Sequence, residues 1–345
     1  MTSCERVLCA LERREPDRVP YVELGVDRSL AERLLGWGGS STQRANLERN
    51  PYTPAEFAEL AGYLGLDAVP YVLRAPVFAR KVEGKDGRLF YAEGLIRSRR
   101  DLGLVELPDP EDDGLYADAR LQAASKGELA ACLVTRAGVF PAMLGMGMEA
   151  FCVALYDDRA LVEELLDRYF GWSTAVARRA EALGFDVFIT TDDLAFKTGP
   201  YIAPSLFREL VMPYYRRLAR EVSLPWIMHS DGNILPYLDD LLSLGVAGIH
   251  PLEREAVDIR AVKREWGNRV CLLGNVDLNI LAAGTPADVE REVRSLIRDL
   301  APGGGYILTS GNSLAGYCVP ENVVAMAAAA RRYGGLGHRG GGPEL

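Results

Sequence analysis

Five apolar, β-prone runs in the second half of the chain end in polar residues: FDVFITTDD (185–193), LPWIMHSDG (224–232), VAGIHPLE (246–253), RVCLLGNVD (269–277) and GYILTSGN (305–312). Helical stretches separate these runs, and such alternation is typical of right-handed βαβ units in a parallel sheet. A strand buried on both faces stays apolar, so polar residues at its carboxyl end need another reason. In β/α barrels that end carries the active site, and the pattern therefore predicts an enzyme.

The number of predicted strands favours a closed TIM (β/α)8 barrel over an open doubly wound sheet. Candidate strands begin near residues 18, 67, 130, 186, 225, 246, 269 and 305, the first within RVPYVELGV (18–26). Lys85-Asp86-Gly87 lies between alternating segments and predicts a hairpin, so that residues 78–107 form an insertion over one end of the barrel. We expect one domain over residues 1–335, with an N-terminal extension, and a disordered Gly-rich tail over 336–345.

Composition excludes several classes of partner. The formal net charge of −9 argues against nucleic acid and against an anionic membrane surface. The sequence contains no run of about 18 apolar residues, so no membrane-spanning segment is expected. The charged N-terminus does not resemble a secretory signal. The six cysteines show no CxxC spacing and predict reduced thiols of a cytoplasmic protein, with Cys271 packed in the core.

The catalytic candidates are acidic residues and histidines at the predicted strand ends. His229 and Asp231 are two residues apart and share one side of a strand, where they can act on substrate or bind a metal; Asp231 can instead cap the next helix. Asp192 and Asp193 are adjacent and point to opposite faces, so one should enter the site while the other caps a loop. A crowded, desolvated carboxyl group there gains a raised pKa and becomes a candidate general acid. Glu253 is a further candidate.

A second set of residues is expected to contact substrate. Each has a structural alternative, such as core packing, a cap or hydrogen bonding between strands. The set consists of Glu23, Arg136, Lys197, Tyr201, His250, Asn275, Asp277 and Asn312.

Longer motifs carry a family resemblance over roughly residues 145–335. They are GFDVFITTDDLAFKTGPYIAPSLFRELVMPYYRRL, PWIMHSDGNILPYLDDLLSLGVAGIHPLE, RVCLLGNVDLNILAAGTPADVEREV, GGGYILTS and VPENVVAMAAAARRYG. The chain resembles the uroporphyrinogen decarboxylase superfamily, which includes porphyrinogen decarboxylases and methyltransferases that work with corrinoid proteins. The resemblance implies a β/α barrel, in agreement with the strand count.

Departures from the decarboxylase pattern favour the methyltransferase branch. Where the decarboxylases carry an arginine-rich RQAGRY segment for substrate carboxylates, this chain has YVELGVDRSLAERL, with Glu23 and only Arg28 as a weak substitute. The FSD element is replaced by VPY at 69–71, and GHGI by GNSL, with Asn312 at the histidine position. A substrate with eight carboxylates needs cations, and this site is expected to be acidic.

Within the methyltransferase branch, the resemblance implies a modified metal site. Coenzyme M-specific members bind zinc through an HxC pair and a later Cys; the matching positions here are His229-Ser230-Asp231 and Asn312. Both thiolates are missing, but a set of His, Asp and Glu ligands can still hold zinc. The HSDG form is similar to that of members that demethylate methoxylated compounds and pass the methyl group to a corrinoid protein.

We therefore hypothesise a methyltransferase that moves a methyl group from a small methylated donor, such as a methoxyaromatic compound, to a corrinoid (cobalamin) carried by a partner protein. A carboxyl acid or zinc at the barrel mouth would assist this O-demethylation. Two alternatives stay open: a carboxy-lyase of the uroporphyrinogen decarboxylase type in tetrapyrrole metabolism, and a non-catalytic barrel that binds a small ligand. A homodimer is implied by the resemblance only.

Overall fold

Seven parallel strands form one sheet in the computed structural model, which describes residues 1–38, 51–84 and 89–335. The strands lie in the order β1 (Ala68–Val72), β4 (Ala130–Arg136), β5 (Val187–Thr191), β8 (Trp226–His229), β9 (Gly248–His250), β10 (Cys271–Leu273) and β11 (Tyr306–Ile307). Each begins within about three residues of a predicted strand, so the parallel α/β fold is confirmed. The predicted turn at Lys85-Asp86-Gly87 and the predicted tail at 336–345 lie outside the described residues.

The predicted first strand, residues 18–26, is wrong as a regular strand. It forms isolated bridges, with Tyr21 opposite Leu308 and Val26 opposite Leu314. The Val22 amide donates to the Leu308 carbonyl (3.0 Å), while the Tyr21 carbonyl accepts from the amide of Asp67 (2.8 Å) next to β1. Pro20 lacks the amide hydrogen that a continuous ladder needs. The segment therefore bonds to both edges of the sheet without becoming a full strand.

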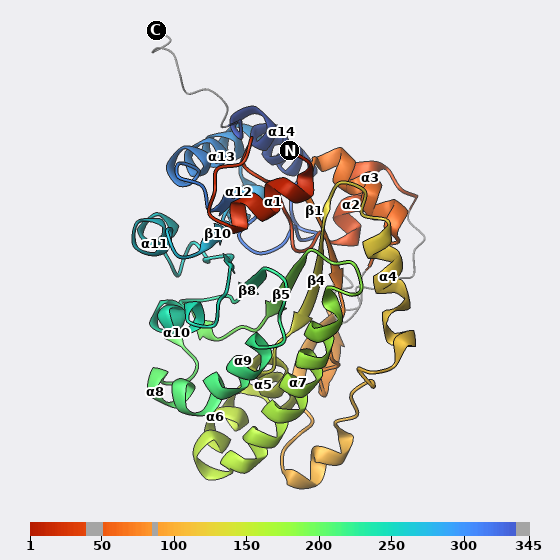
Figure 1. Cartoon of the computed structure of the whole chain (residues 1–345), viewed down its shortest axis with the longest axis vertical. Helices are drawn as coiled ribbons and strands as arrows, with labels where there is room; N and C mark the ends of the chain where they lie inside the picture. The colour runs from red at the N-terminus through yellow and green to blue at the C-terminus, as the bar shows by residue number, and fades with distance from the viewer. Residues whose placement is uncertain (39–50, 85–88, 336–345) are drawn as a thin grey trace.

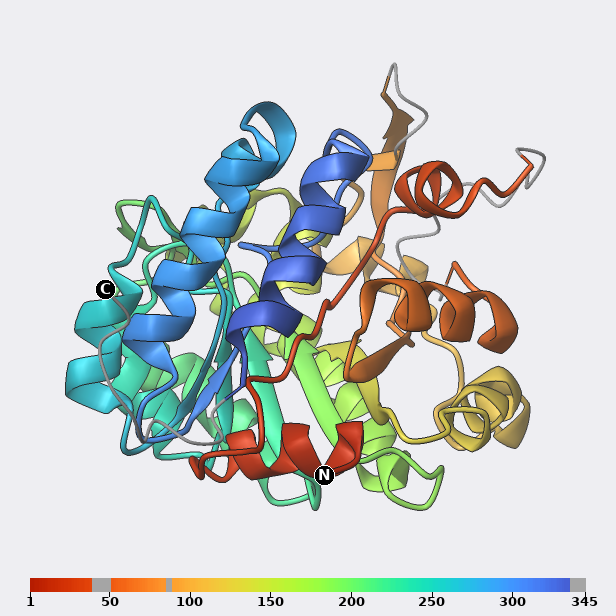
Figure 2. The same ribbon diagram turned by 90° about the horizontal axis from the view of Figure 1, so that it is seen from above.

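Helices surround the curved sheet in both views (Figures 1 and 2). Two consecutive helices, α6 (Met148–Asp157) and α7 (Arg159–Ala180), are separated at Asp158, because this residue leaves the helical conformation and caps α7. Further helices of the described residues include α2 (Arg28–Leu35), α3 (Pro54–Leu64), α4 (Ala117–Ala124), α9 (Met212–Ala219), α11 (Ile259–Trp266), α13 (Pro286–Leu300) and α14 (Pro320–Tyr333).

Helix α1 (Ser3–Leu11) closes the amino ends of the strands, where Figure 2 shows it lying across one end of the sheet. Its Val7, Ala10 and Leu11 belong to the same buried cluster as inward-facing strand residues, including Cys132 and Cys271. This confirms Cys271 as a core residue. Because apolar side chains fill this end, polar chemistry is left to the opposite end.

A small antiparallel pair, β2 (Ala79–Glu83) and β3 (Leu89–Gly94), lies within the predicted insertion. Tyr91 of β3 accepts a hydrogen bond from Arg136, the last residue of β4, at 3.2 Å. The pair thus contacts the carboxyl end of the sheet.

No single helix in the described ranges combines the length and apolar composition needed to cross a bilayer. Helices α5 (Val139–Met146) and α6 meet that test only together, and they are bent by 101° relative to each other.

Candidate active site

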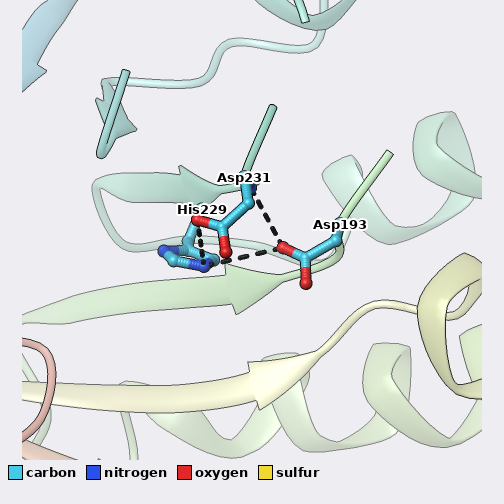
Figure 3. Close-up of side chains that lie close together, drawn as sticks. All are labelled: Asp193, His229 and Asp231. Carbon is cyan, nitrogen blue, oxygen red and sulfur yellow. Dashed lines mark hydrogen bonds and ion pairs between the residues drawn. The ribbon is translucent and has the colours of Figure 1, made fainter. Parts of the chain in front are cut away.

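His229, Asp193 and Asp231 come together at the carboxyl end of the sheet (Figure 3). His229 ends β8, and Asp193 follows the neighbouring strand β5. The His229 Nε2 atom lies 3.7 Å from an oxygen of Asp193 and 3.7 Å from an oxygen of Asp231. The structure thus brings together three of the predicted catalytic residues.

Hydrogen bonds and a tight turn fix the position of Asp231. Its amide donates to Asp193 Oδ1 (3.0 Å), and Asn312 Nδ2 donates to both carboxylate oxygens (2.9 and 2.8 Å). Gly232 follows with φ of 80°, and a Cβ there would lie 2.2 Å from the carbonyl oxygen of Ala195. Only glycine fits this turn.

His250 contacts the ring of His229 through a hydrogen bond between their Nδ1 atoms. It ends β9 opposite His229, is fully buried, and places its Nδ1 2.7 Å from the Nδ1 of His229. Burial, and then the neighbouring His229, hold the pKa of His250 well below its usual range. A neutral His250 therefore shares one proton with His229 across this contact and leaves His229 Nε2 facing the two carboxylates.

Burial makes ionisation of the Asp231 carboxyl group costly. Burial raises the pKa of Asp231 to about 6; Asp193 and Glu253 act in the same direction, and His229 opposes them. Asp231 therefore exchanges a proton near neutral pH, as required of a general acid.

The donor set also fits a divalent metal ion. One imidazole nitrogen and two carboxylate oxygens lie within 4.8 Å of one another. Ligands at about 2.0 Å in a tetrahedral zinc site are separated by roughly 3.3 Å, so the 3.7 Å distances from His229 need only a small closure.

A cavity of about 340 Å³ opens beside the cluster and is lined by Asp193, His229, Asp231 and Asn312. Three arginines line the same cavity: Arg28, Arg74 and Arg136. The cavity therefore contains cationic side chains as well as the acidic ones that were expected. Arg74 was not among the predicted site residues, although it lies two residues beyond β1, as Asp193 lies two residues beyond β5.

Asp192 points away from the cavity, as strict alternation with Asp193 predicted. It accepts hydrogen bonds from the amides of Gly138, Val139 and Phe140 (2.7–3.1 Å) and from the Tyr215 hydroxyl (2.7 Å). Burial raises its pKa to about 6, although all four donors oppose this. Asp192 therefore caps the amide groups at the start of α5.

Three predicted substrate contacts make structural hydrogen bonds outside the cavity lining. The buried Glu23 accepts from the amide and hydroxyl of Ser310 (2.9 and 2.6 Å). The buried Asn275 donates to a backbone carbonyl, and Asp277 caps α12 (Leu278–Ala283). Some polar residues at strand ends therefore line the cavity, whereas others make hydrogen bonds that stabilise the fold.

Lys197, Tyr201 and Glu253 lie around the outside of the cluster. Lys197 pairs with Glu253 (3.5 Å) and with Glu255, and is half exposed. Tyr201 packs edge-on against Phe196, with ring centroids 4.4 Å apart. Glu253 accepts from the Gly232 amide at 3.0 Å and so supports the turn after His229.

A parallel α/β sheet with a histidine–carboxylate cluster and a cavity at its carboxyl ends has the organisation of an enzyme of the β/α class. The chain belongs to the uroporphyrinogen decarboxylase (URO-D) family, whose model matches residues 2–333. The resemblance seen in the sequence is therefore confirmed.

The chain is similar to relatives of both branches. A methylated-thiol–coenzyme M methyltransferase from Methanosarcina mazei is 28% identical over 136 residues, 38% of this chain and 35% of that protein. A uroporphyrinogen decarboxylase from Alkalilimnicola ehrlichii is 25% identical over 252 residues, 67% of this chain and 66% of that protein. The solved structure of a methyltransferase from Methanosarcina mazei has a TM-score of 0.74 at 21% identity, covering 96% of this chain and 99% of that chain. The likeness to this structure shows a shared fold.

Proposed function

We propose that this chain is a cytoplasmic (β/α)8-barrel methyltransferase, one domain over residues 1–335, which transfers a methyl group from a small methylated donor to a corrinoid protein. The observation that carries the proposal is the cluster of His229, Asp193 and Asp231 beside a cavity of about 340 Å³. That volume lies near the lower end of the roughly 300–1,000 Å³ typical of small-molecule sites and suits a small donor. The methyltransferase among the relatives supports this branch of the family.

Breaking the methyl–oxygen bond of an ether requires assistance at the oxygen atom, because alkoxides and phenoxides are poor leaving groups. The methyl carbon would form its new bond to the cobalt of the corrinoid partner as its bond to oxygen breaks, which leaves the electron pair on oxygen. In metal-free protein, Asp231 supplies the proton that this oxygen needs. Asn312 holds the Asp231 carboxyl group in place, and His250 fixes the ring of His229. The alternative to this proton is a metal ion: His229, Asp193 and an ionised Asp231 would hold zinc, which would supply Lewis-acid polarisation of the donor oxygen in place of the Asp231 proton.

The test is methyl transfer to cob(I)alamin from methoxylated donors, followed by the absorbance of methylcobalamin. We expect turnover by the wild type and a loss of about 100-fold or more in His229→Ala. The matched control is Asp277→Asn, which changes a strand-end carboxyl group that caps α12 outside the cluster and should retain activity. Absence of methylcobalamin with every donor, in folded and zinc-supplied protein, would refute the proposal.

The cavity arginines favour one alternative, a carboxy-lyase, because such an enzyme must hold substrate carboxylates. The same preparation tests it: release of carbon dioxide from uroporphyrinogen without methyl transfer would establish the lyase. Binding of a donor without either reaction would establish the non-catalytic barrel. Dimerisation remains a prediction from the resemblance.

A further inference from the structure

The two ring nitrogens of His250 have unequal surroundings. The side chain is fully buried at the end of β9, and its Nε2 atom makes no hydrogen bond with any described residue. Its Nδ1 atom lies 2.7 Å from the Nδ1 atom of His229. Because buried polar atoms in folded proteins nearly always have a partner, the position of the ring proton of His250 has energetic consequences.

The short contact between the two Nδ1 atoms contains one proton, which belongs to one ring or the other. If His229 holds it, a neutral His250 carries its own proton on Nε2, where a buried N–H group then has no described acceptor. If His250 holds it on Nδ1, its Nε2 atom leaves only a lone pair unused. Buried backbone N–H groups without an acceptor are rarer in proteins than carbonyl groups with an unused lone pair, and the same preference favours the second arrangement here.

The carboxylates on the other side of the His229 ring favour the same arrangement. His229 then carries its proton on Nε2, which lies 3.7 Å from an oxygen of Asp193 and 3.7 Å from an oxygen of Asp231. A carboxylate attracts an N–H group at this position and repels a lone pair. The buried side and the cavity side of the histidine pair therefore direct both protons the same way.

We propose that His250 is a positioning residue that donates from its Nδ1 to the Nδ1 of His229, so that metal-free His229 presents an N–H group, and not a lone pair, to Asp193 and Asp231. His229 is then a hydrogen-bond donor at the cavity. A metal ion needs the Nε2 lone pair, so it binds His229 only after the protons have changed places.

The change of place conserves the protons of the pair. His229 loses the proton on Nε2 and takes the shared proton on Nδ1, while His250 gains a proton on Nε2. Each ring holds one proton before and after, so this is a relocation and not a titration. The arrangement of protons rests on the geometry of the pair alone; its use in methyl transfer rests on the proposed function.

The test is long-range proton–nitrogen NMR of the full chain with isotope-labelled histidine, at about pH 8, above the ordinary pKa of an imidazole. The chain has three histidines, and His338→Gln removes the signals of the third. Without metal, we expect protons on His229 Nε2 and His250 Nδ1, with scalar coupling between the two Nδ1 atoms. With zinc bound, we expect protons on His229 Nδ1 and His250 Nε2.

A variant shows whether His250 acts through its nitrogen atoms. His250→Phe keeps an aromatic ring and should move the His229 Nδ1 resonance to that of a nitrogen that accepts no hydrogen bond. The control, Asp277→Asn, changes a carboxyl group outside the cluster and should leave the resonances of both histidines unchanged. An unmoved resonance in His250→Phe would mean that His250 only fills space. The wild-type spectra need no variant, so misfolding of His250→Phe leaves the test intact.

A proton on His229 Nδ1 in metal-free wild type would overturn the proposal, whether or not Nε2 is protonated too. A His250 proton that stays on Nδ1 when zinc binds His229 would also overturn it. If zinc does not bind, the metal-free spectra still decide. Methyl transfer without the expected positions of the protons would support the proposed function and refute this inference, and the reverse result would refute the function alone.

Discussion

The contact between His250 and His229 shows how one buried side chain controls the site. The 2.7 Å separation of their Nδ1 atoms requires one proton between them, so the pair fixes which nitrogen of His229 faces Asp193 and Asp231. Partners of metal-binding histidines act in this way, orienting the ring and setting its tautomer.

Replacing His250 should weaken zinc binding while leaving all three ligands in place. We expect His250→Phe to lower the zinc affinity about 10–100-fold, since this is the usual effect of losing such a partner. His250→Asn retains a hydrogen-bonding group and should recover part of the loss. Competition titration with a zinc chelator measures both; unchanged affinity in His250→Phe would show that His250 is packing alone.

Glu23 gives stability a pH dependence of known sign. Burial raises its pKa from 4.5 to about 8, partly opposed by hydrogen bonds from Ser310. The folded protein therefore holds this proton more tightly than the unfolded chain, and the free energy of unfolding falls as pH rises from about 4.5 to 8. We expect wild type to lose up to roughly 3 kcal/mol more than Glu23→Gln between pH 5 and pH 8, because one pKa unit corresponds to about 1.36 kcal/mol. Urea unfolding at both pH values measures the difference; parallel pH profiles would contradict it.

At the scale of elements, helix α5 depends on Asp192. Three amides at its start and the Tyr215 hydroxyl all donate to this one carboxyl group. The strand places Asp193 in the cavity and Asp192 at the helix, so two adjacent acids serve two purposes.

Removing Asp192 should therefore affect mainly stability, whereas removing Asp193 should affect mainly zinc binding. Asp192→Ala leaves buried donors unsatisfied and should cost about 2–4 kcal/mol of unfolding free energy. Asp193→Ala should cost less than about 1 kcal/mol but reduce zinc binding. Urea unfolding and metal analysis of both variants separate the roles; equal destabilisation would show that Asp193 is structural too.

Sequence reasoning succeeded where local pattern and fold agree. Apolar runs placed seven strands, and alternation correctly separated Asp192 from Asp193. It could not separate Asn275, which hydrogen-bonds the scaffold, from Asn312, which holds Asp231, because both follow a strand. That distinction depends on long-range contacts.

At the scale of the whole molecule, charge is divided across one cavity. Arg74 and Arg136 come from the first half of the chain, and His229 and Asp231 from the second. The sequence predicted His229, Asp231 and Arg136 one by one, but no local pattern shows that residues so far apart line the same cavity.

Helix α1 stabilises the whole sheet by filling its amino end. Leu11 is buried among inward-facing strand residues, so Leu11→Ala should lower the unfolding free energy by about 2–5 kcal/mol. The control is Leu121→Ala on α4, where the side chain is 57% exposed and the change should be small. Urea unfolding measures both; equal effects would contradict a closing role for α1.

The most direct test of the proposed site is the zinc content of the full chain after zinc loading and dialysis. We predict about one zinc per chain in wild type and in Asp277→Asn, and its loss in His229→Ala and Asp231→Ala. Zinc retained in both cluster variants, or no zinc in folded wild type, would contradict a metal centre at His229.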